Sequence, residues 1–174
     1  MLDTSSRPTQ KHTNEKHRSS LESASGRLAA YLDSHKDAMT NEWVARVRKD
    51  SAVPTDSMTK LEIIDHLPAI FDAISEALRQ RRSDTTTEQL HEIAVRHTIV
   101  RWIEHYNLQA VVREISLLRT EFIYHLRVFE EEHPDFGTAP RLFASTTIHQ
   151  ILDDILIDAT NTFLKLTEFH ERSA

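Results

Sequence analysis

Residues 97–119 carry the sequence His-Thr-Ile-Val-Arg-Trp-Ile-Glu-His-Tyr-Asn-Leu-Gln-Ala-Val-Val-Arg-Glu-Ile-Ser-Leu-Leu-Arg. Apolar side chains recur at helical spacing on both sides of Asn107, which predicts two amphipathic helices joined by a turn there. Arg101 lies six residues before Asn107 and Glu114 lies seven residues after it. When the two helices fold back on each other, these side chains come opposite one another. The segment therefore predicts a buried or half-buried ion pair in a helical hairpin, an arrangement that fixes register more than it adds stability.

Other charged side chains are candidates for the same cluster. His97, Arg101 and His105 recur every four residues and share one helix face. The alternative interpretation of this face is a solvated polar ridge. We expect His97 to adjoin the ion pair, and Arg119 to extend it or to face solvent. The prediction is a structural and regulatory network of His97, Arg101, Glu114 and Arg119, without catalytic residues.

The composition favours an all-α domain. The 174 residues include only two glycines and five prolines, too few for a turn-rich sandwich or barrel. The formal charge of −6 argues against general affinity for nucleic acid or anionic lipid. The chain has no cysteine, which excludes disulfides and thiol catalysis. No apolar run approaches the roughly 20 residues of a membrane span, and the N-terminus lacks a secretory signal, so a cytoplasmic location is expected.

Apolar periodicity predicts a single bundle of about five to six helices. The expected helices cover residues 21–34, 36–50, 59–82, 85–105, 108–132 and 139–172. Residues 1–20 are polar and are expected to form a disordered leader. Residues 21–138 are then the core, and residues 139–174 are a long C-terminal helix. Within the third helix, Thr59 and Glu62 match a capping box and Pro68 predicts a kink or break just before it.

The C-terminal helix allows two interpretations. Its apolar residues alternate four and three apart, as in a heptad seam, with Thr162 at the position between Ala159 and Leu166. The apolar members are Ile148, Leu152, Ile155, Ala159, Leu166 and Phe169. One interpretation is a long helix that packs in its own domain. The other is a helix that leaves the domain and pairs with its copy in a homodimer. We expect this helix to lie partly in the core and partly in a dimer and signalling contact.

Patterns typical of enzymes are weak. Two isolated glycines cannot form a phosphate-binding loop, and no nucleophile stands in a recognisable context. Glu88 and His91 have the Glu-x-x-His spacing of di-iron bundles, but the only other such units lie at helix ends. His97 and His149 lie near apolar stripes and are the candidates for a second hypothesis, a haem or small-molecule sensor. We expect no enzyme activity, no cofactor and no metal.

The segment from His97 to Arg119 resembles the RsbRD-type N-terminal domain, which precedes STAS domains in stressosome proteins and the kinase core in many bacterial sensor histidine kinases. Two other segments are similar to this family, and the resemblance spans about residues 25–168. The matching residues are His97, Arg101-Trp102, Tyr106, Leu108, Glu114 and Leu118-Arg119; Asp65-His66-Leu67-Pro68-Ala69-Ile70-Phe71-Asp72; and Trp43 with Arg46-Val47. The chain departs from the family at His105, often glycine, and at Ile115, commonly aromatic. The loss of glycine affects the turn, because histidine enters positive φ less readily.

The resemblance implies a helical input domain, globin-like but without haem, that regulates a signalling module in cis or in trans. That module would be a kinase or a stressosome component. The resemblance also implies that the final helix runs into the output module as a dimeric signalling helix. His170-Glu171-Arg172 matches only the start of a phosphoacceptor motif, so phosphotransfer by this chain is not expected.

Overall fold

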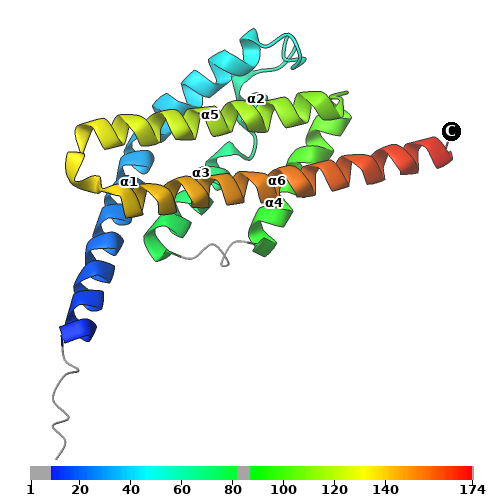
Figure 1. Cartoon of the computed structure of the whole chain (residues 1–174). Coiled ribbons are helices and arrows are strands. Elements are labelled where there is room, and N and C mark those ends of the chain that lie inside the picture. Colours follow the sequence, from blue (N-terminus) through cyan, green and yellow to red (C-terminus); the bar gives the residue numbers. More distant parts are fainter. Residues whose placement is uncertain (1–8, 82–86, 174) are drawn as a thin grey trace, which may run out of the picture.

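The structure, a computed structural model, describes residues 9–81 and 87–173, with side chains for residues 24–81 and 88–173. These parts contain six α-helices and one short 3-10 helix (Figure 1). The helices are α1 (Thr9–Lys49), α2 (Lys60–Ile64), α3 (Leu67–Gln80), α4 (Thr87–Ile103), α5 (Leu108–Glu132), η2 (Pro134–Phe136) and α6 (Thr138–Ser173). The prediction of an all-α bundle with a long C-terminal helix is confirmed. None of the described helices is long and apolar enough to cross a membrane.

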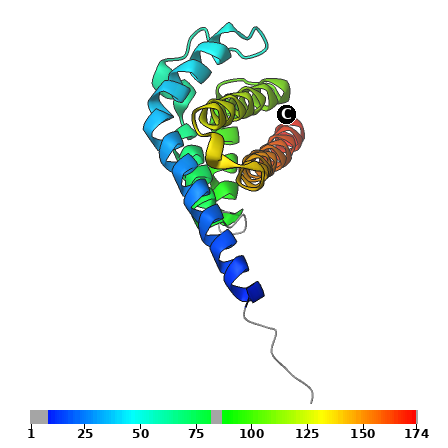
Figure 2. The same ribbon diagram turned by 60° about the vertical axis from the view of Figure 1, so that its left-hand side comes forward.

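Two long helices, α5 and α6, form one side of the bundle (Figure 2). They lie side by side and run in opposite directions (Figure 1). α6 packs mainly against α4 and α5, whereas α1 packs mainly against α3 and α5. Figure 2 shows α1 crossing one side of the bundle, with α5 and α6 seen nearly along their axes. Phe71 of α3 and Phe122 of α5 meet in the core with ring centroids 4.7 Å apart.

α1 corrects the prediction of two helices over residues 21–34 and 36–50. Its buried face runs through the expected break, because Leu32 and Met39 on either side of it are both fully buried. Ser34 and His35 do not end the helix. Both side chains bond to the carbonyl of Tyr31 one turn earlier, which leaves the backbone helical.

The expected disordered leader, residues 1–20, lies partly outside the described residues. Residues 9–20 form the first turns of α1. They contain neither proline nor glycine, and extending an existing helix is far easier than nucleating one. Helix formation by these residues therefore follows from the packed part of α1.

The break before Pro68 is confirmed and separates α2 from α3. Thr59 and Glu62 form the predicted capping box at the start of α2, and Pro68 lies in the first turn of α3. Between the helices, Asp65 adopts φ 36° and ψ −105°, a backbone conformation that residues other than glycine rarely adopt. Leu61, which the periodicity placed on the core side, is 81% exposed, whereas Ile63 of the same short helix is fully buried in the core.

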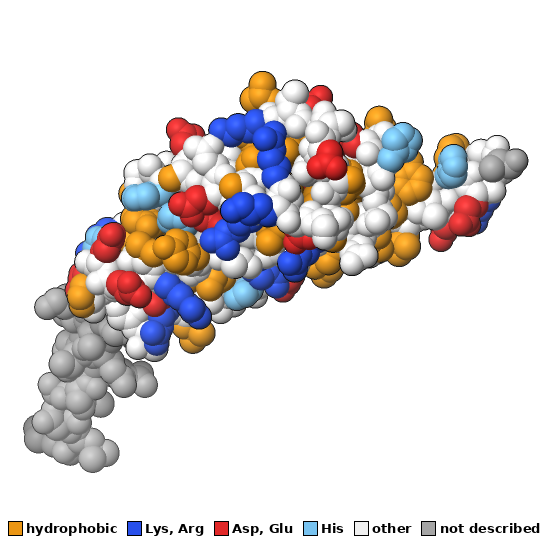
Figure 3. Space-filling view, turned by 90° about the horizontal axis from the view of Figure 1, so that it is seen from above, with side chains coloured by type: hydrophobic (Ala, Val, Ile, Leu, Met, Phe, Trp, Pro, Cys, Tyr) orange, Lys and Arg blue, Asp and Glu red, His pale blue; other side chains and the backbone are white. Residues whose placement is uncertain are grey.

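The seam predicted on α6 belongs mostly to the core of its own domain. Its first four members, Ile148, Leu152, Ile155 and Ala159, are all buried against neighbouring helices. Only the last two differ: Leu166 is half-buried and Phe169 is 72% exposed. Figures 1 and 3 show the last turns of α6 reaching beyond the other helices. A heptad spacing also describes one face of a packed helix, which is why the sequence did not separate the two interpretations.

Candidate functional site

The turn between α4 and α5 brings the predicted hairpin together. Asn107 caps α5, since its side chain accepts a hydrogen bond from the amide of Ala110 at 2.8 Å. His105 adopts φ 62° at the end of α4, the left-handed conformation that favours glycine. The amides of His105 and Tyr106 bond to the carbonyls of Trp102 and Arg101, which is the pattern of a Schellman motif. The histidine therefore occupies the left-handed position of this motif.

Arg101 and Glu114 meet across this hairpin, as their spacing from Asn107 predicts. The Arg101 Nε donates to Glu114 Oε2 at 2.9 Å, and the two side chains are 0% and 1% exposed. Tyr106 donates to the other carboxylate oxygen at 3.3 Å, and burial raises the pKa of this tyrosine. Its ring also lies under the guanidinium, 5.1 Å away. Both charges are thus paired inside the protein, which is the condition for a tolerable buried ion pair.

Arg101 also closes the end of α2. Its terminal nitrogens donate to the backbone carbonyls of Glu62 and Ile63 at 3.0 and 2.8 Å. These carbonyls belong to the last turn of α2 and have no further helical partner, because the helix ends at Ile64. Another hydrogen bond of the guanidinium, at 2.9 Å, goes to the carboxylate of Glu104, the residue directly after α4. The guanidinium therefore links the α2–α3 break to the α4–α5 hairpin.

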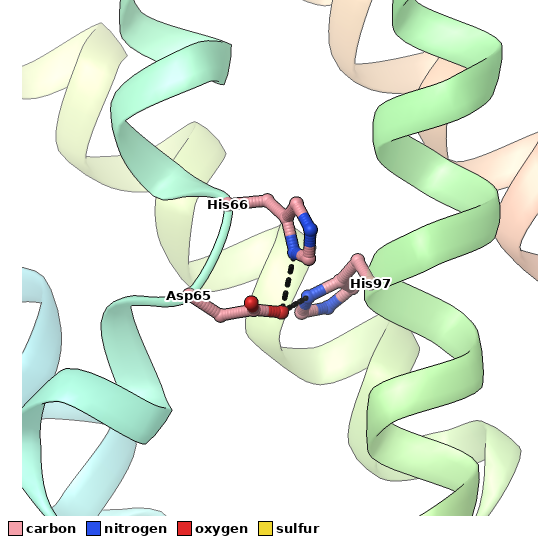
Figure 4. Close-up of side chains that lie close together, drawn as sticks. All are labelled: Asp65, His66 and His97. Atoms are coloured by element: carbon pink, nitrogen blue, oxygen red, sulfur yellow. Dashed lines mark ion pairs between the residues drawn. The ribbon is translucent and has the colours of Figure 1, made fainter.

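Two histidines and an aspartate form the outer part of this site. His97 of α4 lies between two carboxylates, with Nε2 3.3 Å from Glu114 Oε2 and Nδ1 3.5 Å from Asp65 Oδ2. The same Asp65 oxygen lies 2.5 Å from Nδ1 of His66. Figure 4 shows this oxygen between the two imidazoles, which approach it from the α2–α3 break and from α4. We call Asp65, His66 and His97 the Asp65 cluster.

The electrostatics of the Asp65 cluster favour charged groups in spite of burial. Burial lowers the pKa of His97, but Asp65 and Glu114 outweigh it, and the net shift is upward from 6.5. Burial likewise raises the pKa of Asp65, but the neighbouring imidazoles of His97 and His66 outweigh it and the net shift is downward. The cluster therefore stabilises an imidazolium beside two carboxylates.

A small cavity adjoins the site. It is lined mainly by apolar side chains, together with His97 and Glu114, and has a volume of about 20 Å³. That volume holds roughly one water molecule. The described residues around His97 therefore leave no space for the haem of the second hypothesis.

Other predicted site residues lie elsewhere. Arg119 pairs with Asp153 of α6 rather than with the network. Arg119 lies five residues after Glu114, and this spacing places the two side chains on different faces of α5. His149 is half-buried at a surface hollow that also includes Arg119. Glu88 is exposed, and His91 pairs with Asp158 at 3.1 Å on the surface. No described carboxylates gather around Glu88 and His91 in the manner of a di-iron site.

A second buried polar cluster lies between α1 and α5, and the sequence did not indicate it. Glu121 is 0% exposed, 3.1 Å from the Nε of Arg46 and 3.4 Å from the Nε2 of His125. Burial raises the pKa of Glu121 to about 7, and the neighbouring carboxylate of Glu42 adds to the effect. Neither oxygen of Glu121 has a well-formed hydrogen bond.

Asp65 and His66 are the main site residues that the sequence-based network omitted. The signal available for them was Pro68, since a break before a proline leaves both residues outside any helix. The carbonyls at the end of α2 also need donors, and a buried arginine is a suitable one. Neither signal identifies α4 as the helix that supplies the second histidine.

Comparisons with protein-family models, curated proteins and solved structures give no significant match for this chain. The resemblance to the RsbRD-type N-terminal domain thus remains a prediction from the residues that carry it. What can be said of function comes from the site and from α6.

Proposed function

We propose that the chain is a non-enzymatic regulatory input domain of a bacterial signal-transduction protein in the cytoplasm. It acts through α6 on a histidine kinase or a stressosome-type output module. The observation that carries the proposal is an aromatic contact between the buried site and the end of α6. Trp102 follows Arg101 on α4, and its ring lies 4.9 Å from that of Phe163 and 6.3 Å from that of His170, both on α6.

This contact connects two parts of the molecule with different roles. The site joins α2, α4 and α5, so a change in any of these helices alters the position of α4. α4 in turn makes the most extensive helix–helix contact with α6. A shift of α4 therefore reaches the part of α6 that extends beyond the bundle. The shift and rotation of packed helices is a common way of passing a regulatory signal.

The proposal includes a homodimer formed by the last turns of α6. Leu166 and Phe169 continue the apolar face near the end of α6, where Leu166 is half-buried and Phe169 is 72% exposed. Sedimentation of the chain should show a dimer that Phe169→Glu weakens. The control is Leu142→Glu, because Leu142 is 66% exposed at the other end of α6. A strict monomer at high concentration would contradict this part of the proposal.

A chimaeric kinase tests the signalling role. Residues 9–173 are fused through α6 to the dimerisation and catalytic core of a sensor kinase, with zero to six residues added at the junction. Kinase output should rise and fall with the added length, because a helical connection rotates with a period of about 3.5 residues. Trp102→Ala should change the output at a fixed junction, whereas Leu142→Ala should not. Output that ignores both the junction length and Trp102→Ala would refute the proposal.

A further inference from the structure

Polar atoms of the Asp65 cluster lie close together without well-formed hydrogen bonds. Oδ2 of Asp65 and Nδ1 of His66 are only 2.5 Å apart, yet neither atom makes a well-formed hydrogen bond, and both are shielded from solvent. Nδ1 of His97 lies on the other side of the same oxygen, at 3.5 Å. Two imidazole nitrogens and one carboxylate oxygen thus converge on one small region from two separate segments (Figure 4). A shared cation, either a proton on an imidazole or a metal ion, stabilises such an arrangement.

We infer that Asp65, His66 and His97 form a binding site for a divalent transition-metal ion, with Zn²⁺ as the best fit. The three ligand atoms all lie within 4.8 Å of one another. Ligands about 2.0–2.1 Å from a tetrahedral zinc are roughly 3.3 Å apart. The Asp65–His97 separation of 3.5 Å is already close to this value. The His66 ring needs to move back by less than about 1 Å, which a rotation of its side chain provides.

The donor set indicates which ions suit the site. Two imidazole nitrogens and one carboxylate oxygen favour Zn²⁺ and its neighbours over Mg²⁺ and Ca²⁺, which prefer oxygen ligands. Three protein ligands leave a fourth position for water or a small anion. The three side chains are 12–19% exposed, so the cluster lies close to the protein surface.

The surroundings of His97 match those of a metal-bound histidine. Ligating histidines usually direct their second ring nitrogen to a carboxylate, which orients the ring and increases its basicity. Nε2 of His97 faces Glu114 at 3.3 Å, and Glu114 is itself held by Arg101. The strained backbone of Asp65, with φ 36°, is also typical of a residue held in place for a functional reason.

Calorimetric titration of the chelator-treated chain with Zn²⁺ tests the inference. We expect one ion per chain, and no comparable binding of Mg²⁺. His66→Gln and Asp65→Asn should each weaken binding by more than about 100-fold, and Glu114→Gln by roughly 10–100-fold, the range for partners of ligating residues. His91→Gln is the matched control, because His91 also lies beside a carboxylate, 3.1 Å from Asp158, but away from the cluster. It should bind Zn²⁺ as the unaltered chain does.

Two additional measurements keep the test decisive. The absorption spectrum of bound Co²⁺ should show a tetrahedral site that His66→Gln abolishes. Circular dichroism establishes that each variant is folded. His66→Gln carries the test if Asp65→Asn does not fold, since Nδ1 of His66 makes no well-formed hydrogen bond. Absence of Zn²⁺ binding, or binding that His66→Gln leaves unchanged, would overturn the inference. The inference concerns binding alone and does not depend on the signalling role proposed above.

Discussion

Replacing Arg101 by methionine tests how the buried cluster is held together. Methionine keeps most of the apolar volume but removes all four hydrogen bonds that the guanidinium donates, to Glu114, Glu104 and the carbonyls of Glu62 and Ile63. The carboxylate of Glu114 then stays buried without its main partner, which costs about 3–5 kcal/mol. Each carbonyl left without a donor adds roughly 1 kcal/mol. We therefore expect Arg101→Met to lower the free energy of unfolding by about 5 kcal/mol or more.

The double variant Arg101→Met with Glu114→Leu separates these contributions. It removes the stranded carboxylate, so about 3 kcal/mol should return. Roughly 2 kcal/mol should stay lost, because the carbonyls of Glu62 and Ile63 still have no donor. Urea unfolding of the parent chain, both single variants and the double variant gives the coupling energy between Arg101 and Glu114.

The coupling energy distinguishes a buried ion pair from an exposed one. A buried pair should give a coupling energy of at least about 2 kcal/mol, well above the value for exposed pairs. Glu114→Gln is the milder comparison, because Arg101 then keeps Glu104 and both carbonyls. Single variants that each cost less than about 1 kcal/mol and add without coupling would refute the buried-pair reasoning.

Two further predictions concern single residues outside the ion pair. The pKa of Glu121 is raised to about 7 from 4.5, so its contribution to stability is present below about pH 4.5 and is lost as the pH rises through 7. Glu121→Gln should remove this loss and stabilise the chain at pH 8 by on the order of 3 kcal/mol, measured by urea unfolding across this pH range; an unchanged pH profile would count against it. His105→Gly should stabilise by about 1 kcal/mol, because glycine enters the φ of 62° without strain. Thermal unfolding should show a rise of about 2–4 °C, and a fall would contradict the role assigned to this turn.

The parts of the fold that the sequence predicted are those with local causes. Asn107 marks the turn. Arg101 and Glu114 lie at similar sequence separations before and after it, so the two side chains meet when the hairpin forms. Pro68 breaks its helix through its own ring, and Thr59 caps α2 through its own side chain. Each of these features depends on residues at most 13 positions apart, so a single short segment contains all the information.

Features that depend on neighbouring helices could not be predicted in this way. The apolar face of α6 has the same spacing whether it packs on α4 or on another copy of itself. The burial of Ile148, Leu152, Ile155 and Ala159 distinguishes the two arrangements, and this burial depends on the neighbouring helices. Asp65 meets His97 because the α2–α3 break folds against α4, which no local pattern specifies. Glu121 was missed because a glutamate on the predicted helix gives no sign that Arg46 covers it from α1.

Glu114 connects the ion pair and the proposed metal site, and this connection makes the two experiments interdependent. Its Oε2 faces both the Nε of Arg101 and the Nε2 of His97. When Arg101 is replaced, the stranded carboxylate gains from any positive charge bound to the far side of His97. Zn²⁺ should therefore stabilise Arg101→Met more than it stabilises the parent chain. By linkage, the same factor must appear as tighter Zn²⁺ binding by that variant, because coupling between two sites is reciprocal. Equal stabilisation of Arg101→Met and the parent chain by Zn²⁺ would mean that Glu114 interacts with Arg101 and not with the metal site.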